Sequence, residues 1–259
     1  MIEGRWELKY MIHEQAVLGL LELVGDDAVP DEHAEDIGLG RRGYTVSSVY
    51  LDNHGFDGYT ERLRMDRIRN RVRVRTYGQP GSDAPVFLEA KRKLDNQVIK
   101  HRGYACGNQE WLALGPRPWQ AIPDKVTGLD RVRAKRFVRH VDGMKMETVC
   151  LVRYEREIFK SGSARLTLDR DVRAAPRPQA TELLGPCPAR LFPKDWIVLE
   201  LKFFDQMPGW MRRVNAQLRL RSEPVSKFAL GVATTVRADH PHELAQLTPA
   251  TLRRLEAAA

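Results

Sequence analysis

Cysteine is scarce in this 259-residue sequence, and the few cysteines do not form a recognisable metal or disulfide set. Cys106, Cys150 and Cys187 are three in number, and no two of them have CxxC spacing. A disulfide framework and a thiolate zinc site are therefore both unexpected, and a reducing compartment such as the cytoplasm fits. The seven histidines show no zinc-ligand spacing either.

Long hydrophobic runs are also missing. The longest nearly apolar run covers residues 16–24 (AVLGLLELV) and contains Glu22, and it is far shorter than the roughly 20 residues that span a bilayer. We therefore expect a soluble cytoplasmic chain, and no membrane partner can be identified from the sequence. Repeats and low-complexity linkers are absent too, which predicts one domain over 1–259, with a core at about 5–235 and a tail at 237–259.

Acidic residues are fewer than basic ones. Lys and Arg number 42 against 34 Asp and Glu, which gives a formal net charge of +8 and a pI near 9.5. Such an excess favours an anionic partner: nucleic acid, a phosphorylated metabolite or an acidic membrane surface.

The basic residues are concentrated in the segment RIRNRVRVRTYG, residues 67–78. Arginine occupies every second position from Arg67 to Arg75. Two residues is the repeat of a β-strand, so these guanidinium groups are expected on one face of a strand.

Hydrophobic periodicity predicts mostly strands, with helices in some of the gaps. The expected strands are 5–12, 44–52, 67–77, 86–94, 97–105, 147–160, 164–172 and 196–204. The expected helices are 14–24, about 55–63, 108–114, 129–140, 208–220 and 226–236. Residues 26–43 and 174–195 are expected to be long connections. Several strands follow one another directly, which indicates an α+β fold with a large antiparallel sheet or barrel.

Nearly every expected strand has one apolar face and one charged face. The charged faces carry mostly cations: Lys9, Arg71, Arg73, Arg75, Lys91, Lys93, Lys100, Arg102, Arg156, Arg165 and Lys202, against Glu7, Glu89 and Glu200, with Asp169 unassigned. A charged face often points to water, but water-facing strands usually mix both signs, since like charges on neighbouring strands repel. The amphipathic helices also need apolar surface on which to pack. These points favour an eight-stranded, tunnel-like barrel with its charged face inward and helices outside.

Such an interior predicts a polyanionic ligand, because buried like charges are costly without a counter-charge. The few glutamates are then suited to a divalent cation beside the anion. Double-stranded nucleic acid is disfavoured, since a duplex cannot enter a tunnel of this size.

Eight short motifs, in order, resemble VTC-type polyphosphate polymerase domains of the triphosphate tunnel metalloenzyme superfamily, which also contains the CYTH phosphatases. They are ELKY (7–10), SVYLDN (48–53), RVRVRTYG (71–78), LEAKRK (88–93), YERE (154–157), ARLTLD (164–169), LELK (199–202) and SKF (226–228). The resemblance covers about residues 5–235. It implies an antiparallel tunnel with basic walls and ATP-dependent extension of inorganic polyphosphate, with Mn²⁺ or Mg²⁺ as cofactor.

The resemblance also implies functional residues. The phosphate-binding and catalytic set is Lys9, Arg73, Arg75, Lys91, Lys100, Arg156, Arg165 and Lys227, with Arg102 and Lys202 as neighbours on the same faces. Glu200, together with Glu7, is the expected metal site. The resemblance does not identify an adenine platform; Tyr50 and Tyr104 are candidates for it, and packing is the more common role of aromatic residues on strands. Lys227 has a second interpretation, as a surface lysine at a helix start that Ser226 caps.

One departure from the superfamily concerns the first strand. The phosphatase branch carries Glu-x-Glu-x-Lys, and here Arg5 replaces the first glutamate of that pattern. This favours the polymerase branch if Arg5 is native, although IEGR (2–5) is also a common protease-cleavage linker. A metal-dependent triphosphatase and a non-catalytic polyphosphate-binding module remain the alternatives. The sequence does not predict the oligomeric state.

Overall fold

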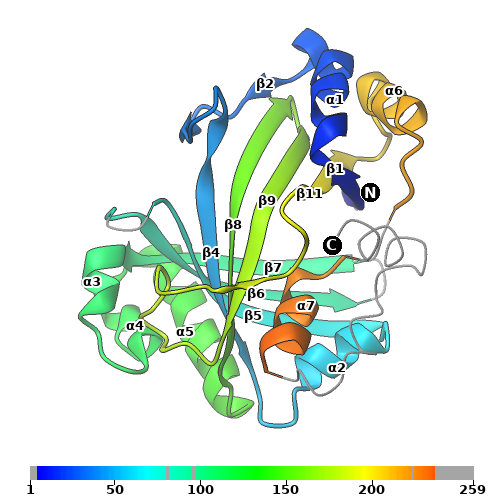
Figure 1. The fold of residues 1–259 in the computed structure, drawn as a ribbon. Helices are drawn as coiled ribbons and strands as arrows, with labels where there is room; N and C mark the ends of the chain where they lie inside the picture. Colours follow the sequence, from blue (N-terminus) through cyan, green and yellow to red (C-terminus); the bar gives the residue numbers. More distant parts are fainter. Residues whose placement is uncertain (1–4, 80–81, 95–96, 223–224, 237–259) are drawn as a thin grey trace.

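The computed structural model describes residues 5–79, 82–94, 97–222 and 225–236 (Figure 1). The tail predicted at 237–259 lies outside these residues. That residues 1–259 form one domain, with a core at about 5–235, stays a prediction.

An antiparallel sheet runs through the whole molecule (Figure 1). Its long strands follow one another in the order β1 (Arg5–His13), β11 (Trp196–Phe204), β9 (Ala164–Pro176), β8 (Glu147–Ser161), β4 (Arg42–Asp52), β5 (Ile68–Tyr77), β6 (Pro85–Leu94) and β7 (Gln97–Gly107). Three two-residue strands, β2 (Val29–Pro30), β3 (Glu35–Asp36) and β10 (Ala189–Arg190), join the sheet from the two long connections. The α+β fold class and the eight long strands expected from the sequence are confirmed.

The sheet curls without closing into a hydrogen-bonded barrel. Within the described residues, β1 and β7 are the two ends of the strand order and do not pair with each other. The two sides of the curled sheet nevertheless approach across the concave side, because Lys91 Nζ on β6 lies 3.7 Å from Glu7 Oε2 on β1. Side-chain contacts therefore bridge the space that backbone pairing leaves open.

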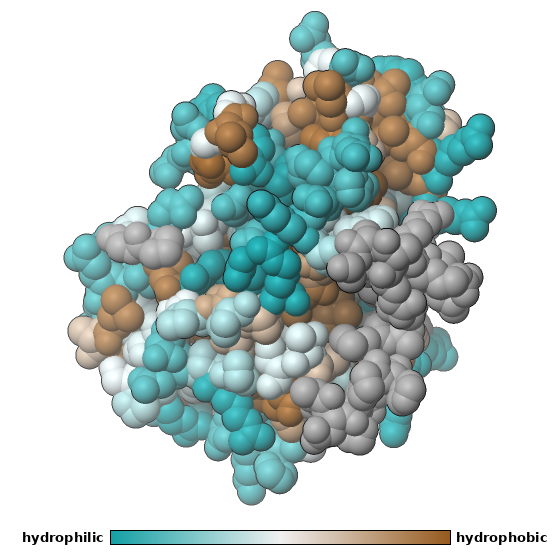
Figure 2. All heavy atoms as spheres, viewed as in Figure 1, coloured by the Kyte–Doolittle hydropathy of each residue, from teal (hydrophilic) through white to brown (hydrophobic). Residues whose placement is uncertain are grey.

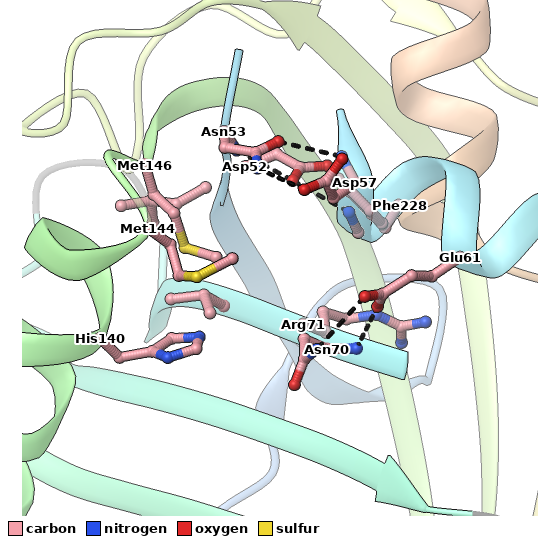
Figure 3. Close-up of a pocket in the computed structure, with 13 residues that line it drawn as sticks. Asp52, Asn53, Asp57, Glu61, Asn70, Arg71, His140, Met144, Met146 and Phe228 are labelled. Carbon is pink, nitrogen blue, oxygen red and sulfur yellow. Dashed lines mark hydrogen bonds between the residues drawn. The ribbon is translucent and has the colours of Figure 1, made fainter. Parts of the chain in front are cut away.

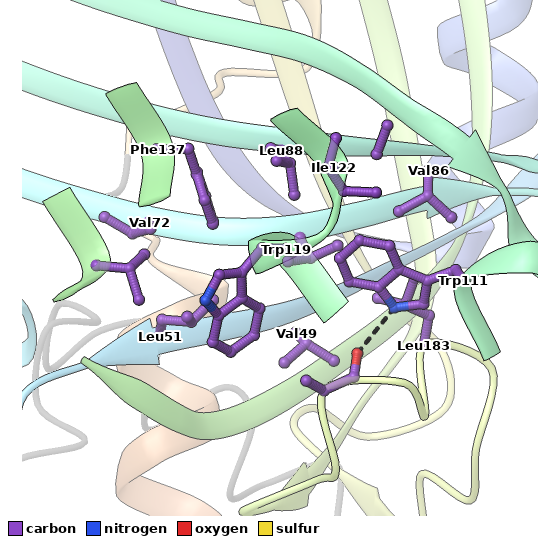
Figure 4. Close-up of a cluster of buried hydrophobic side chains, with 14 of the residues drawn as sticks. Val49, Leu51, Val72, Val86, Leu88, Trp111, Trp119, Ile122, Phe137 and Leu183 are labelled. Atoms are coloured by element: carbon purple, nitrogen blue, oxygen red, sulfur yellow. Dashed lines mark hydrogen bonds between the residues drawn. The ribbon is translucent and has the colours of Figure 1, made fainter. Parts of the chain in front are cut away.

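Helices cover the outer, apolar face of the sheet. The 3₁₀ turns η1 (Glu14–Ala16) and η2 (Gly25–Asp27) flank α1 (Val17–Val24), which packs with α6 (Gly209–Gln217) against leucines of β9 and β11. The turn η3 (Pro118–Gln120) and α3 (Asn108–Leu112), α4 (Ile122–Lys125) and α5 (Gly128–Gly143) cover β5, β6 and β7. Figure 4 shows this second core around Trp111, Trp119 and Phe137, in which Trp111 Nε1 donates to the carbonyl of Ala180.

The helix α7 (Lys227–Thr235) is an exception, since it packs on the inner face. Gly231 approaches β8 so closely that a Cβ there would lie 2.7 Å from Cys150 Sγ and 3.0 Å from a Val152 methyl group. Both of these residues share a face with Arg156, because side chains alternate along a strand. The helix therefore fills one end of the concave side, beside α2 (Asp57–Leu63).

On the outer surface, hydrophobic residues gather over α1 and α6, at the upper right of Figure 2. Leu18 of α1 is 71% exposed there. None of the helices in the described residues is both long enough and apolar enough to cross a membrane.

We expect Leu199→Ala to lower the free energy of unfolding by about 2–5 kcal/mol, because removing a fully buried leucine leaves a cavity. Urea denaturation measures this change. The matched control is Leu18→Ala, which removes an exposed leucine and is expected to change stability by less than about 0.5 kcal/mol. Equal losses in the two variants would contradict the placement of Leu199 in the core.

Candidate functional site: a basic lumen on the inner face

The concave side of the sheet, which we call the lumen, is lined by the arginines of β5. Arg71, Arg73 and Arg75 alternate with Val72 and Val74, and both valines are buried in the outer core. The same alternation on β6 and β7 places Glu89, Lys91, Lys100 and Arg102 beside these arginines, according to the strand register. One strand pattern therefore sends apolar side chains to the helices and cations to the lumen.

Glu89 is the centre of one group of cations, and its residue is only 2% exposed. Arg73 Nε donates to Glu89 Oε2 at 2.7 Å, and Arg73 Nη2 lies 2.5 Å from the same oxygen. Lys100 Nζ is 3.1 Å and Arg102 Nε 3.4 Å from Oε1. Burial alone would raise the pKa of Glu89, but Arg73, Arg75 and Lys100 outweigh it and hold that pKa far below its usual range. Glu89 is therefore a carboxylate at neutral pH.

Arg75 differs from Arg73 because it has only neutral partners. Its Nε donates to Ser48 Oγ at 2.8 Å and its Nη2 to the Tyr154 hydroxyl at 3.4 Å. The residue is 6% exposed, and no described carboxylate lies within 4 Å of it. A buried guanidinium without a counter-ion is costly, so this position favours an anion in the lumen.

A second group of ion pairs centres on Asp169 of β9. Arg156 on β8 binds Asp169 with two hydrogen bonds of 2.6 and 2.7 Å, and Lys227 Nζ lies 2.6 Å from Asp169 Oδ2. Lys227 is the first residue of α7, and Ser226 caps that helix by accepting from the backbone N–H of Ala229. Both interpretations of Lys227 therefore hold in part: Lys227 begins the helix that Ser226 caps, and its side chain points into the lumen rather than to the surface.

The two glutamates Glu7 and Glu200 form a third group with lysines. Lys202 Nζ is 2.8 Å from Glu200 Oε1, and Lys9 Nζ is 3.2 Å from Glu7 Oε1. Arg156 Nη2 lies 3.6 Å from Glu200 Oε2, which joins this group to Asp169. Burial would raise the pKa of both glutamates, but the surrounding cations outweigh it, so both pKa values lie below the ordinary one. Two ionised carboxylates therefore lie together.

This pair of carboxylates fits a hard divalent cation. Within the described residues no group of three His, Cys, Asp or Glu side chains is placed to hold a metal. Mg²⁺ is typically bound by one or two carboxylates, with substrate phosphates and water completing the shell. Thr167 lies opposite Glu200 in the strand register, and its buried Oγ1 has no hydrogen-bond partner among the described residues. Glu7, Glu200 and this free hydroxyl oxygen supply suitable oxygen donors.

Lysine and tyrosine side chains of the lumen have shifted pKa values. Burial is the main cause that lowers the pKa of Lys91 to about 8, with Arg71 and Lys9 adding to it and Glu7 opposing it. Burial would raise the pKa of Tyr50, but Arg73, Arg75 and Arg71 outweigh it and lower this pKa to about 8. Both groups therefore titrate close to physiological pH.

Two expected site residues lie differently from the rest. Arg165 is opposite Lys202 in the register but is exposed, with no ion pair among the described residues. Tyr50 is 3% exposed and its ring packs on Phe228 at 4.9 Å, so the ring offers no free face to a base. Its hydroxyl instead accepts from Arg73 Nη1 at 3.2 Å.

An aromatic row borders the Arg102 end of the lumen. Ring centroids of Tyr77 and Phe87 are 5.9 Å apart, and those of Phe87 and Tyr104 are 6.0 Å apart. The Arg102 guanidinium lies 3.8 Å from the centroid of Phe87. Tyr104 is 43% exposed, so this row offers an accessible aromatic surface.

Sequence reasoning placed Arg71 and Glu89 on the inward face but did not predict that Glu89 pairs with Arg73, Lys100 and Arg102. It assigned no role to Asp169, Tyr154 or Ser48, which contact the lumen cations described above. Tyr154 lies two residues before Arg156, so strand alternation alone would have placed it in the lumen.

Comparison with known proteins identifies the family. The model of the VTC domain matches residues 4–236. The chain belongs to the VTC domain family. This assignment confirms the family that the eight motifs predicted.

No curated protein matches this VTC domain in sequence. Three solved structures that resemble it each share 13% sequence identity with it. A Hippeastrum protein described as having a dominant triphosphatase activity has a TM-score of 0.49 and covers 91% of this chain and 97% of its own. A Pyrococcus horikoshii protein has a TM-score of 0.46 (87% and 98%). A Vibrio parahaemolyticus protein has a TM-score of 0.44 (88% and 97%). The assignment rests on the domain match.

We expect Glu89→Gln to lower the free energy of unfolding of the ligand-free VTC domain by roughly 3 kcal/mol, because it removes the counter-charge of three lumen cations. Saturating tripolyphosphate is expected to restore part of this loss, since an anion replaces the missing charge. Thermal unfolding with and without tripolyphosphate measures both effects. Glu155→Gln is the control, because Glu155 forms a single, partly exposed pair among the described residues, with Arg41 at 3.6 Å, and a pair of this kind is worth about 1 kcal/mol. If Glu89→Gln matches the control, Glu89 does not balance the lumen charge.

We expect the affinity for tripolyphosphate to fall above pH 8. The pKa of free Lys91 is about 8, and a bound anion stabilises the charged ammonium, so binding becomes weaker once the free lysine loses its proton. The slope for this one group is at most about tenfold per pH unit. Calorimetric titration from pH 7 to 9 measures it. Lys91→Arg keeps its charge over this range, so its profile should be flatter; identical profiles would exclude Lys91 as the source.

Proposed function

We propose that this VTC domain is an ATP-dependent polyphosphate polymerase, which transfers the γ-phosphate of ATP to a growing polyphosphate chain in the lumen. The observation that carries the proposal is Arg75, a buried guanidinium with only hydroxyl partners, in a wall where cations outnumber carboxylates. A phosphate chain supplies negative charge along its whole length and fits such a wall. Membership of the VTC domain family supports the same assignment.

The arginines of β5 position the reacting phosphates in this proposal. Arg73 and Arg75 are two residues apart on one strand, so their planar guanidinium groups can each bind adjacent phosphates with two hydrogen bonds. Lys91 and Lys100 add point charges from β6 and β7. Arg156 and Lys227 bring charge from β8 and α7 on the opposite wall. Phosphoryl transfer depends mainly on such positioning and charge stabilisation.

The chemical step needs no protein base. A terminal phosphate oxygen of the chain attacks the γ-phosphorus of ATP, and the bond from the γ-phosphorus to the β–γ bridging oxygen breaks. ADP leaves with that oxygen, and the chain is longer by one phosphate. The attacking oxygen is already anionic near pH 7, so no proton has to be removed. Arg73 and Arg75 stabilise the charge that builds up on the transferred group.

Glu200 and Glu7 are the residues that would hold the divalent cation. Their ionised carboxylates meet the oxygen preference of Mg²⁺ or Mn²⁺. The ion would offset negative charge on the phosphates. Lys9 and Lys202 contact the same two carboxylates, so an ion bound there would free both lysines for phosphate.

The aromatic row of Tyr77, Phe87 and Tyr104 is our candidate for the adenine platform. Tyr104, predicted as one of two alternatives, remains available because of its exposure. Base stacking on an exposed aromatic ring at the lumen rim would leave the triphosphate pointing inward, toward Arg102 and Arg73.

The second candidate function is a metal-dependent triphosphatase in the same lumen. It is favoured by the Glu7 and Glu200 pair, since two ionised carboxylates can orient a water as well as a metal. In that case the acceptor of the phosphoryl group is water, and the product is orthophosphate.

We expect purified protein to form long polyphosphate from ATP with Mn²⁺ or Mg²⁺, and we expect Arg73→Ala and Glu200→Ala to lose at least a hundredfold in rate. Gel electrophoresis and ³¹P NMR of the products measure polymer, ADP and orthophosphate. Arg139→Ala is the matched control, because Arg139 is an exposed arginine of α5 outside the lumen.

Each product pattern decides between the candidates. Internal-phosphate signals with equivalent ADP, lost in both lumen variants, support the polymerase. Orthophosphate from tripolyphosphate without polymer shows the triphosphatase. Tight binding of tripolyphosphate without any turnover shows a binding module and removes both catalytic proposals.

A further inference from the structure

A second basic site lies on the outer face of the sheet, between α5 and the strands β5, β6 and β7. Arg71 and Lys91 of the lumen wall also line it, at the point where it meets the sheet. It is a groove with a volume of about 290 Å³. Its apolar floor includes Leu88, Ala90 and Phe137, while Arg92, Arg133, Arg136, His101 and His140 contribute cationic or titratable groups. None of the described lining residues is an Asp or Glu.

The start of α5 lies close to β7, and the groove is lined by residues Arg133 to His140 of the helix. Near its start, Asp130 Oδ1 accepts from the backbone N–H of Tyr104 at 3.1 Å. Gly103 permits this approach, since a Cβ there would lie 3.0 Å from Arg133 Cβ. Further along the helix, Arg136 and His140 face a part of the sheet where Ala90 pairs with His101 in the register. The small Ala90 side chain leaves the space between them unfilled.

The charges of the groove are poorly neutralised. Arg92 and Arg136 are exposed and have no carboxylate within 4 Å among the described residues. Arg133 has one such contact, with Asp130 at 3.7 Å. Arg92 also lies near enough to His140 to help lower the pKa of its imidazole, after burial as the main cause. Arginines of β6 and α5 therefore border the same apolar groove.

A small cavity adjoins the groove at one end. It has a volume of about 20 Å³, roughly enough for one water, and it shares Asn70, Arg71, Val72 and His140 with the groove. In Figure 3 His140 of α5 faces the strand that carries Asn70 and Arg71. Glu61 of α2 accepts from the backbone N–H of Asn70 at 2.7 Å, so α2 borders this small cavity.

We propose that the groove is a binding site for a mononucleotide on the face of the sheet opposite to the lumen. Arginines that approach from two elements can donate hydrogen bonds to phosphate oxygens. An apolar floor adds stabilisation only for a ligand with a ring whose flat face can pack on it, as a nucleobase does. The groove volume of about 290 Å³ lies just below the range of about 300–1,000 Å³ that is typical of ligand pockets, so the groove has room for at most one nucleotide. An inorganic polyphosphate would use the cations but not the floor. The inference does not rest on the polymerase activity proposed for the lumen.

Fluorescent mant-ADP tests this proposal when the lumen is first filled with excess tripolyphosphate. We expect saturable binding that remains under these conditions, and we expect Arg92→Ala and Arg136→Ala each to weaken it by about tenfold or more. Ile99→Glu places a carboxylate at a groove residue that is 51% exposed, and it should also weaken binding without disturbing the core. Arg139→Ala removes an exposed α5 arginine that does not line the groove and should have no effect.

Three results would overturn the proposal. Loss of mant-ADP binding on addition of tripolyphosphate would place the nucleotide in the lumen or show that the groove takes inorganic polyanions. Unchanged affinity in Arg92→Ala, Arg136→Ala and Ile99→Glu would place the site elsewhere. Competition by pyrophosphate as strong as competition by ADP would show that the apolar floor contributes nothing. Circular dichroism and thermal unfolding of each variant show whether weaker binding reflects a folding defect.

Discussion

The rest of the structure depends on the excess of positive charge that the sheet encloses on its concave face. On β5 the same alternation that points Val72 and Val74 toward the helices points Arg73 and Arg75 into the lumen. The outer face is stabilised by burial of apolar surface. The inner face opposes closure of the sheet, because like charges approach one another and lose water. An anion in the lumen removes this opposition, so folding and ligand binding favour the same curled shape.

The buried carboxylates make the ligand-free lumen possible. Glu89 holds Arg73, Lys100 and Arg102 on one wall, and Asp169 holds two more cations on the other wall. Glu7 and Glu200 lie among cations as well, but they also lie next to each other. Adjacent carboxylates repel unless a cation lies between them. The first kind of site is therefore suited to ordering phosphate-binding side chains, and the second to binding a metal ion.

Strand alternation predicted the eight long strands and motif order predicted the family, because both can be read directly along the sequence. The inward direction of the charged face was inferred from the excess of cations on several strands and from the helices that need apolar surface. The inner position of α7 was not predictable in this way. An amphipathic pattern shows that one side of a helix is buried, but not which surface covers it. The sequence also does not show which residues of a strand lie deep in the lumen and which lie at its end. Arg165 shares the face of Asp169 yet remains exposed. The short α4 was missed because four residues provide no helical period.

The presence of carboxylates among the lumen cations also affects how fast a polyanion can be released. A lumen lined only by cations would bind a polyanion tightly and release it slowly, since opposite charges in a low-dielectric space attract strongly. Catalysis instead needs binding that is stronger for the transition state than for substrate or product. If Arg73 binds phosphate as proposed, it gives up its contact with Glu89 for one with the ligand, so only the difference between these contacts adds to affinity. Arg75 has no carboxylate to give up and should contribute more to binding. A cation that is paired with a carboxylate should therefore mainly orient the phosphate chain, and a cation without such a partner should mainly contribute to its affinity.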